Sequence, residues 1–273
     1  MESDTLTLVL GGTGKTGRRV AERLRARGRT VRVGSRAGSP PFDWDDPGTW
    51  PAALSGAAAV YLTYQPDLAV PGAAERIADF ARLAARSGVR RVVMLSGRGE
   101  AAAHAAEQGV RESGMAWTVL RSAWFHQNFS EGPLAAAVGA GELALPAGEV
   151  AEPFVDAGDI ADVAVAALTA DGHAGRTYEL TGPRLLTFAE AAAELGRAIG
   201  RPVRYRPVSA AEFEAAAAAE LPAAEARLLA ELFTTTLDGR NAYLTDDVPH
   251  LLGRPGTDFA AYARRAAASG AWG

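Results

Sequence analysis

The sequence predicts an α/β protein with a doubly wound parallel sheet and a smaller, mostly helical region toward the C-terminus. Three observations support this prediction. In the first half of the chain, short β-branched runs alternate with alanine-rich stretches of helical spacing. A glycine-rich turn separates the first strand from the first helix. After Arg121 the alternation stops, and a long segment rich in aromatic and small residues follows.

Strands that are separated by helices over short connections imply parallel pairing, with helices on both faces of the sheet. In chain order, the expected strands are residues 5–10, 30–34, a short third strand near 42–44, 57–63, 91–95 and 117–120. The expected helices are residues 15–28, 51–54, 71–87 and 104–113. In the helix at 71–87, Ile77, Phe80, Ala81 and Ala84 share one face, and Gly88 ends it.

Shorter elements are expected in the second half. The strands are residues 142–145, 152–155 and 177–180, with an extended piece at 202–207. The helices are residues 159–168, 187–199, 210–220, 222–233 and 257–268. Thr187, with Glu190 three residues later, has the spacing of a capping box at the start of one of these helices.

The amino-acid composition excludes several kinds of catalytic and metal site. The 273 residues contain no Cys, so disulfides, thiolate nucleophiles and Cys-ligated metal centres are excluded. Lys15 is the single lysine among 28 basic residues, and any role that needs a lysine falls to it. The four histidines lack a His-x-x-x-His spacing, so we expect no metal site. A net charge of −4 gives no basic footprint for nucleic acid.

Targeting signals are also not evident. No apolar run approaches the roughly 18 residues of a membrane span. Residues 1–4, Met-Glu-Ser-Asp, are acidic and lead directly into a strand pattern, which is not typical of a signal peptide. We therefore expect a cytoplasmic protein whose partner is a small molecule, with no nucleic acid and no membrane involved. A homodimer is left open.

The turn after the first strand reads Gly11-Gly12-Thr13-Gly14-Lys15-Thr16-Gly17. Gly11 permits a tight turn, Gly14 lets the backbone approach a pyrophosphate, and Gly17 lets the helix pack closely on the sheet. The N-terminus of the helix offers N–H groups and a partial positive charge to phosphates. We interpret this loop, including Thr13, Lys15 and Thr16, as a dinucleotide site of the Rossmann type. It is not a P-loop, because Val9 stands where the first P-loop glycine is required.

The second strand ends in Ser35 and Arg36. NAD enzymes carry an acidic residue here for the ribose 2′-hydroxyl, whereas a hydroxyl and a guanidinium suit a 2′-phosphate. Lys15 adds a second cation. The sequence thus predicts NADP(H) as the cofactor, with an ordinary surface arginine as the alternative for Arg36. We expect a dinucleotide-binding domain at 1–125, with residues near 152–181 returning to it. A substrate-binding cap would comprise residues 126–151 and 182–273.

Short-chain dehydrogenases use a Tyr-x-x-x-Lys pair, in which the lysine lowers the pKa of the tyrosine that protonates the substrate. Lys15 lies in the glycine loop, so these 273 residues contain no such pair. The segment that would hold it reads His104-Ala-Ala-Glu107.

Further motifs are spread along nearly the whole chain. They are Asp43-Trp44, Ser96, His104-x-x-Glu107, Trp117-Thr-Val-Leu-Arg121, Trp124-Phe125-His126-Gln127-Asn128, Phe154-Val-Asp156, Asp159-Ile160-Ala161 and Thr187-Phe188-x-Glu190. Together with the glycine loop, they resemble the NmrA-like group of atypical short-chain dehydrogenases. That group includes triphenylmethane reductase, quinone oxidoreductases and ergot-alkaloid reductases that act on iminium ions. It also includes non-catalytic dinucleotide-binding regulators.

The resemblance implies a set of site residues. Around the cofactor these are Asp43 and Trp44 near the adenine, and Thr63, Tyr64, Ser96 and Gly97 at strand ends. Residues 122–125 would pass near the nicotinamide, and the candidates for substrate binding are Trp124, Phe125, His126 and Phe154. For Trp44 and Phe125, ordinary core packing is an equal alternative.

Hydride transfer to an iminium carbon needs no proton, because the substrate already carries the positive charge. The sequence therefore favours cationic or conjugated acceptors (imines, quinones or dye-like aromatic molecules) over simple ketones. Tyr64 and His104 are candidates for a substitute acid, and His126 is another. An ordinary surface or partly buried histidine is the alternative for His104 and for His126. We expect Glu107 to be a solvated or structural helix residue and not a base. We expect Arg121 to orient the loop that follows it or a carboxylate such as Asp156. The competing hypothesis is a non-catalytic NADP(H)-binding redox sensor.

Overall fold

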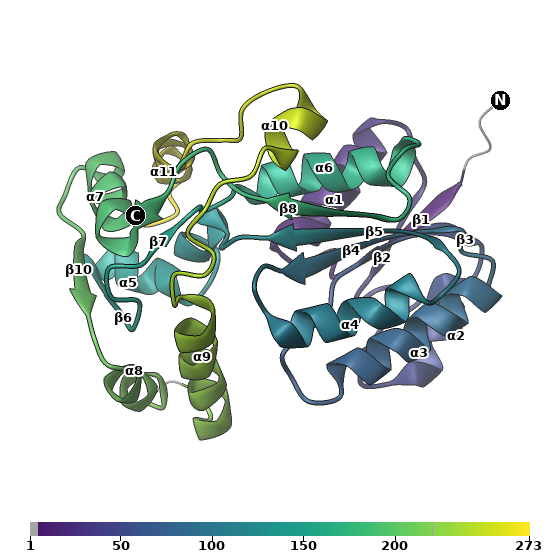
Figure 1. The fold of residues 1–273 in the computed structure, drawn as a ribbon, viewed down its shortest axis with the longest axis horizontal. Helices are drawn as coiled ribbons and strands as arrows, with labels where there is room; N and C mark the ends of the chain where they lie inside the picture. Colours follow the sequence, from purple (N-terminus) through teal and green to yellow (C-terminus); the bar gives the residue numbers. More distant parts are fainter. Residues whose placement is uncertain (1–4, 220) are drawn as a thin grey trace. The chain divides into compact units, whose positions relative to one another are not determined.

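The structure is a computed structural model that describes residues 5–219 and 221–273 (Figure 1). The acidic start at residues 1–4, and Glu220 at the end of one expected helix, lie outside the described residues. The chain divides into two compact units. Unit 1 comprises residues up to Ser122, Ala157–Leu180 and Asp247–Gly253, and unit 2 comprises Ala123–Asp156, Thr181–Asp246 and Arg254–Gly273.

Unit 1 is built on a six-stranded sheet in the order β2-β1-β3-β4-β5-β8, in which every neighbouring pair is parallel. The strands are β1 (Leu6–Leu10), β2 (Val31–Gly34), β3 (Ala57–Leu62), β4 (Arg91–Gly97), β5 (Ala116–Ser122) and β8 (Arg176–Leu180). The chain runs from β1 to β2 on one side and then returns to β3 on the other. The strand order therefore reverses between β1 and β3, and doubly wound sheets bind ligands at the carboxyl ends of such strands.

Helices cover both faces of this sheet, as the sequence predicts (Figure 1). They are α1 (Lys15–Ala26), α2 (Trp50–Leu54), α3 (Ala73–Arg86), α4 (Ala101–Arg111), α6 (Ala157–Thr169) and α10 (Asp247–Leu252). Helices α1 and α6 pack together on one face, and α3 packs with α4 on the other. Burial on both faces leaves Leu8, Val9 and Leu10 of β1 with no exposed surface, which explains why this strand is continuously apolar.

The expected third strand near residues 42–44 is wrong, because residues 35–46 contain no strand. Instead, the backbone N–H groups of Gly38 and Phe42 both donate to the carbonyl oxygen of Ser35, at 2.9 Å each, and fold the segment back on itself. Two prolines at 40 and 41 remove backbone donors that a strand needs. The rings of Phe42 and Trp44 pack in the core of unit 1 instead of pairing in the sheet.

Unit 2 has shorter elements. Its paired strands are β6 (Glu142–Leu145) with β10 (Arg204–Pro207), and β7 (Ala151–Glu152) with β9 (Leu186–Thr187). Its helices are α5 (Leu134–Ala140), α7 (Phe188–Ile199), α8 (Ala210–Ala217), α9 (Ala223–Thr236) and α11 (Phe259–Ala268). The strand expected at 152–155 is shorter than predicted, and Val155 instead forms an isolated bridge with Phe125. Helices α5 and α10 were not expected, because seven and six residues are too few to show a helical period.

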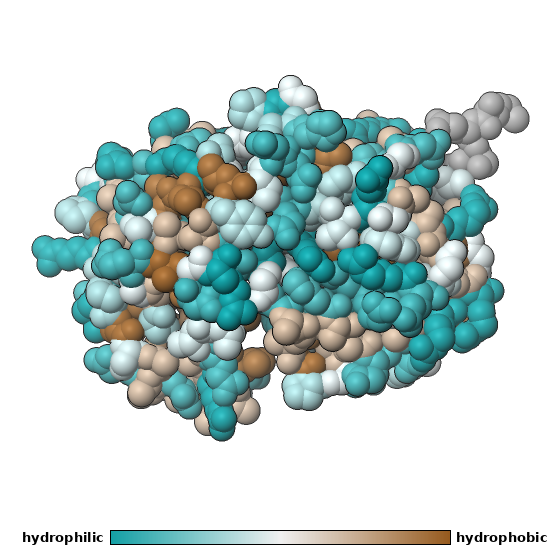
Figure 2. Space-filling model, in the orientation of Figure 1, coloured by the Kyte–Doolittle hydropathy of each residue, from teal (hydrophilic) through white to brown (hydrophobic). Residues whose placement is uncertain are grey.

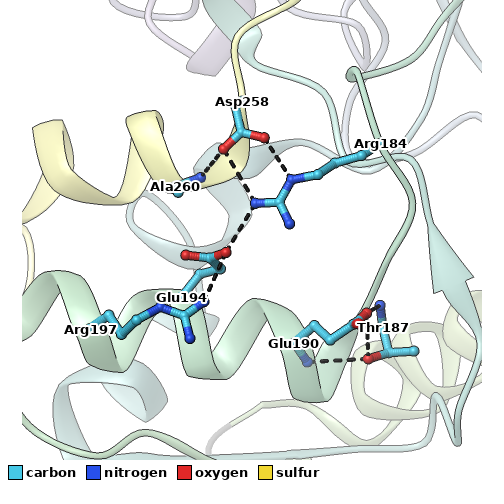
Figure 3. Close-up of polar contacts among 7 residues, drawn as sticks. All are labelled: Arg184, Thr187, Glu190, Glu194, Arg197, Asp258 and Ala260. Carbon is cyan, nitrogen blue, oxygen red and sulfur yellow. Dashed lines mark hydrogen bonds and ion pairs between the residues drawn. The ribbon is translucent and has the colours of Figure 1, made fainter.

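The capping box at the start of α7 is confirmed (Figure 3). The Thr187 hydroxyl accepts from the backbone N–H of Glu190 at 3.1 Å, and the Glu190 carboxylate accepts from the backbone N–H of Thr187 at 2.8 Å. Two N–H groups that the helix leaves without partners are thus satisfied. The helix begins where the sequence predicts.

An ion-pair network joins α7 to the start of α11 within unit 2 (Figure 3). The Arg184 guanidinium binds Asp258 at 2.6 Å and Glu194 at 3.0 Å, and Glu194 also pairs with Arg197 at 2.8 Å. Asp258 caps α11 by accepting from the backbone N–H of Ala260 at 2.9 Å. The hydrogen bond from Arg184 holds the pKa of Asp258 below its ordinary value. This network positions α11, and its charged groups satisfy one another.

Hydrophilic residues cover much of the face drawn in Figure 2, with separate apolar patches among them. Among residues 5–219 and 221–273, the large apolar side chains that are exposed all belong to unit 2, and they are Leu185, Tyr243 and Leu244. None of the helices in the described part of the chain has the length and apolar character needed to cross a bilayer. Among the described residues, no three His, Asp or Glu side chains are grouped so that they could hold a metal ion.

Candidate functional site

The glycine loop lies between β1 and α1 and is shaped by close backbone contacts. Gly11 has a φ of +59°, and a Cβ there would lie 2.3 Å from Thr63 Oγ1. A Cβ at Gly17 would lie 2.2 Å from the carbonyl oxygen of Gly11. Both positions therefore exclude a side chain. Gly14 is less constrained, because its φ is −83° and a Cβ would be 3.3 Å from the nearest atom, the Gly11 carbonyl oxygen.

The N-terminus of α1 is suited to an anion. Gly14 is the N-cap residue, no side chain caps the helix, and its first turn contains no acidic residue. No acidic side chain of the first turn therefore offsets the partial positive charge at this end of the helix. The Gly14 N–H donates to the Gly11 carbonyl oxygen at 2.8 Å, which closes the turn and brings the start of the helix to the end of β1. These features fit a bound pyrophosphate.

Thr63 and Tyr64 lie directly after β3, beside the glycine loop. The Thr63 hydroxyl donates to the carbonyl oxygen of Leu10 at 3.2 Å and so links the ends of β3 and β1. The carbonyl oxygen of Thr63 accepts from Trp44 Nε1 at 3.1 Å, and the ring centroids of Trp44 and Tyr64 are 4.9 Å apart. The Tyr64 hydroxyl accepts from Arg76 at 3.3 Å. The structure thus brings Thr63, Tyr64 and Trp44 together at the point where the strand order reverses.

Asp43 holds the loop that carries Trp44. Its carbonyl oxygen accepts from Trp50 Nε1 at 2.7 Å, and its carboxylate accepts from the backbone N–H of Asp45 at 3.0 Å. Trp44 is only 7% exposed and packs against Phe80, with ring centroids 5.2 Å apart. This agrees with the core-packing alternative for Trp44.

Ser35 and Arg36 follow β2 at the same edge of the sheet. The carbonyl oxygen of Ser35 closes the turn described above, and its side chain is half-buried. The Arg36 side chain is exposed and forms no ion pair with any residue that the structure describes. Lys15 is half-buried at the start of α1. The predicted cofactor residues therefore lie at the carboxyl ends of β1, β2, β3 and β4.

A buried network occupies the ends of β4 and β5. The carboxylate of Glu107, 1% exposed, accepts two hydrogen bonds from Arg121 at 2.8 Å each and one from the Ser96 hydroxyl at 2.8 Å. Arg111 adds a contact at 3.0 Å. Glu107 is therefore structural, as expected. Arg121 pairs with a carboxylate, as expected, and the carboxylate is that of Glu107 on α4.

The charge of Glu107 is stabilised by these neighbours. Burial alone would raise the pKa of the carboxyl group. The hydrogen bonds from Arg121, Arg111 and Ser96 outweigh burial and hold the pKa of Glu107 below its ordinary value. Because Ser96 donates its hydroxyl hydrogen to this carboxylate, it fixes the end of β4 next to Gly97.

Two further titratable groups lie at the start of α4. His104 is half-buried, and its Nε2 atom is buried with no hydrogen-bond partner among the described residues. Glu100 is the N-cap residue of α4, and it is not among the residues predicted from the sequence. Burial, and then the charge of Asp67, raise the pKa of Glu100 to about 7. Its place three residues after the end of a buried strand was the available sequence signal.

The four candidate substrate residues all belong to unit 2. Trp124 is half-buried, with its ring centroid 4.8 Å from that of Phe233. Phe125 is half-buried and pairs by its backbone with Val155. These two side chains keep some exposed surface, and their role toward a substrate stays a prediction.

His126 and Phe154 have almost no exposed surface. His126 Nε2 lies 2.9 Å from the carbonyl oxygen of Phe154, and Nδ1 lies 3.6 Å from a carboxylate oxygen of Asp156. That Asp156 oxygen also pairs with Arg265 at 3.1 Å. The Phe154 ring lies among other rings, 5.1 Å from Phe188. Both side chains thus have packing roles in the core of unit 2.

Residues 11–171 match the model of a family described as NAD(P)H-binding. This match covers the glycine loop, the ends of β2, β3 and β4, and more than half of the chain. The chain belongs to this NAD(P)H-binding family.

Similar proteins extend over nearly the whole length. The chain is 35% identical to an NAD(P)H azoreductase from Xenophilus azovorans, over 97% of the chain and 99% of that protein. It is 32% identical to agroclavine dehydrogenase from Claviceps fusiformis, over 93% of the chain and 94% of that protein. Among solved structures, the NADPH complex of a quinone oxidoreductase from Escherichia coli has a TM-score of 0.77 and 25% identity, covering 96% of this chain and 99% of that one.

Proposed function

We propose that the protein is an NADPH-dependent oxidoreductase that delivers hydride to a cationic or conjugated small molecule without a Tyr–Lys pair. The observation behind this proposal is the position of Lys15, the one lysine, at the first residue of α1. A lysine there can serve the cofactor phosphates but is not on α4, where the pair would be. The names of similar proteins, an azoreductase, an agroclavine dehydrogenase and a quinone oxidoreductase, support the oxidoreductase class.

The chain's own groups fit the cofactor. Residues 11–17 and the uncapped start of α1 would hold the pyrophosphate, and Arg36 with Lys15 would hold a 2′-phosphate. Thr63 and Gly97, at the ends of neighbouring strands, would line the nicotinamide half. When bound, the reduced cofactor supplies a hydride ion, and the protein's part is to position the acceptor and exclude water.

The acceptor preference follows from the acid–base groups. Tyr64 already accepts a hydrogen bond from Arg76, and Glu107 is enclosed by two arginines and Ser96. Simple ketones gain most from a positioned acid, because the alkoxide that forms as hydride arrives is a far stronger base than the delocalised anion of a reduced quinone or azo group. An iminium ion or a triarylmethane cation needs no proton. We therefore propose an aromatic, conjugated acceptor, for which Trp124 and Phe125 are the candidate contacts.

The Arg36→Ala variant tests the cofactor assignment. We expect its Kd for NADPH to rise by about tenfold or more, because one charge-assisted contact of about 1.5 kcal/mol is lost. The Kd for NADH should change little. Titration of protein fluorescence with each cofactor measures both constants. Arg25→Ala is the matched control, because Arg25 is an exposed arginine at the far end of α1. Equal affinity of the wild-type protein for NADH and NADPH would contradict the assignment.

An acceptor panel tests the reaction. With NADPH, we expect the purified protein to reduce crystal violet, a cyclic iminium ion and 1,4-naphthoquinone, and to reduce cyclohexanone at least about a hundredfold more slowly. Loss of absorbance by NADPH measures each rate. Turnover confined to simple ketones would overturn the acceptor ranking. Tight NADPH binding with no turnover of any acceptor would favour the redox sensor instead.

A further inference from the structure

The Glu100 carboxyl group fills a space that a glycine leaves at the end of β4. A Cβ at Gly97 would lie 2.3 Å from Glu100 Oε1 and 2.9 Å from Oε2. Gly97 pairs with Ser122, and these are the last residues of β4 and β5. The carboxyl group therefore lies against the backbone at the carboxyl edge of the sheet, where ligands bind in this architecture.

The Glu100 carboxyl group has no polar partner in the part of the chain that the structure describes. No described residue forms a hydrogen bond or an ion pair with the Glu100 side chain, and it does not cap its own helix. An acidic group that is partly removed from water without a cation is harder to ionise. Burial, and then the negative charge of Asp67 in the segment after β3, raise the pKa of Glu100 to about 7. This carboxyl group therefore holds its proton at higher pH than an ordinary glutamate does.

The other charged groups near α4 have partners elsewhere. Arg98, before Gly99, pairs with Glu179 of β8. Glu107, further along α4, is held by Arg111 and Arg121.

Two more titratable groups near Glu100 are Arg76 and His104. On α3, which packs against α4, Arg76 contacts Asp45 and Tyr64. His104 lies one turn after Glu100, and its backbone N–H donates to the Glu100 carbonyl oxygen at 3.0 Å. Among the described residues, Asp67 is thus the charged group that raises the pKa of Glu100.

We infer that Glu100 is the proton donor for neutral conjugated acceptors, in place of the absent Tyr–Lys pair. This rests on the proposed function and adds one residue to it. A quinone or azo group that gains a hydride on one atom becomes an anion on another. Glu100 gives its proton to that oxygen or nitrogen, the new O–H or N–H bond neutralises the product, and the resulting carboxylate regains a proton from water. A cationic acceptor becomes neutral on gaining hydride and does not need this proton.

The two acceptor classes should therefore respond differently to pH and to Glu100→Gln. At saturating NADPH, wild-type kcat/KM for 1,4-naphthoquinone should fall by about tenfold between about pH 6 and pH 8, as a carboxyl with a pKa near 7 loses its proton. Glu100→Gln should lower that kcat/KM by about 100-fold at about pH 6 and remove the slope. With crystal violet, the variant should keep its rate within about threefold.

Glu112→Gln removes an exposed carboxylate at the other end of α4 and should leave both acceptors unchanged. An equal fall for both acceptors in Glu100→Gln, or a pH slope that persists in this variant, would overturn the inference. If wild type reduces neither acceptor, the proposed function fails as well, which is a separate and visible outcome.

A second readout uses the protein without cofactor. In protein with ¹³C-labelled glutamate side chains, one carboxyl resonance should titrate near neutral pH, and Glu100→Gln should remove it while Glu112→Gln should not. A Glu100 resonance that titrates in the ordinary range for glutamate would overturn the inference, whatever the enzyme's activity.

Discussion

Glu107→Ala is expected to lower the free energy of unfolding by about 3 kcal/mol, because removing one member of a buried ion pair leaves its partners uncompensated. The variant would remove the two hydrogen bonds from Arg121 to this carboxylate and leave the Ser96 hydroxyl, 4% exposed at the end of β4, without its acceptor. Urea unfolding followed by circular dichroism at about pH 7 measures the change. NADPH binding should weaken too, because Ser96 and Gly97 end the strand beside the site.

The loss of stability in Glu107→Ala should become smaller as the pH falls. The pKa of Glu107 is held below its ordinary value, so its contribution is present above the ordinary glutamate range and is lost as the pH falls through the lowered value. The difference between wild type and variant should therefore shrink in acid. Glu112→Ala, at an exposed position on the same helix, should change stability by less than about 0.5 kcal/mol. A Glu107→Ala protein as stable as this control would contradict the buried network.

Gly17→Ala should have the second large effect, on cofactor binding. The added methyl would lie 2.2 Å from the carbonyl oxygen of Gly11 and 2.6 Å from its carbonyl carbon. Both are backbone atoms, so the loop has to move relative to α1. A displacement of about 1 Å in a binding loop can cost about 100-fold, and we expect the Kd for NADPH to rise by that factor. Stability should fall by about 1–3 kcal/mol.

Gly139→Ala provides the matched control for this variant. Gly139 lies within α5 of unit 2, and nothing stands within 4 Å of the Cβ it would gain. Alanine is also the better helix former, so stability should be unchanged or slightly higher and NADPH binding unaffected. Unaltered binding in Gly17→Ala would show that this glycine is not needed for the phosphate site.

Local patterns were sufficient for most of the fold. The apolar run of β1, the helical face of α3 with Ile77 and Phe80, and the Thr187 capping box are encoded within a few residues, and each is found as predicted. The prediction of a third strand was wrong. Aromatic residues at 42 and 44 suggest a strand, but the prolines at 40 and 41 and the packing against Phe80 give an irregular loop instead. Helices α5 and α10 were too short to show a period.

The candidate site could be predicted only where one segment contains the whole signal. The glycine loop is such a segment, since its turn and helix start are contiguous. The pairing of Arg121 with Glu107 was not predicted, because it depends on the pairing of β4 with β5 and on the position of α4, which bring two residues 14 positions apart together. Glu100 was missed because its importance depends on the empty side-chain position at Gly97 and on Asp67 in another loop.

Direct hydride transfer to a conjugated cation is the central claim, and isotope transfer tests it most directly. Crystal violet is reduced at its central carbon, and a C–H bond formed there does not exchange with water. With NADPH deuterated at C4 on the transferred face, the leuco dye should contain one deuterium by mass spectrometry, at a rate that matches NADPH loss. A leuco dye without deuterium from either C4-labelled face, or no reduction of the dye while a simple ketone is reduced, would contradict the claim.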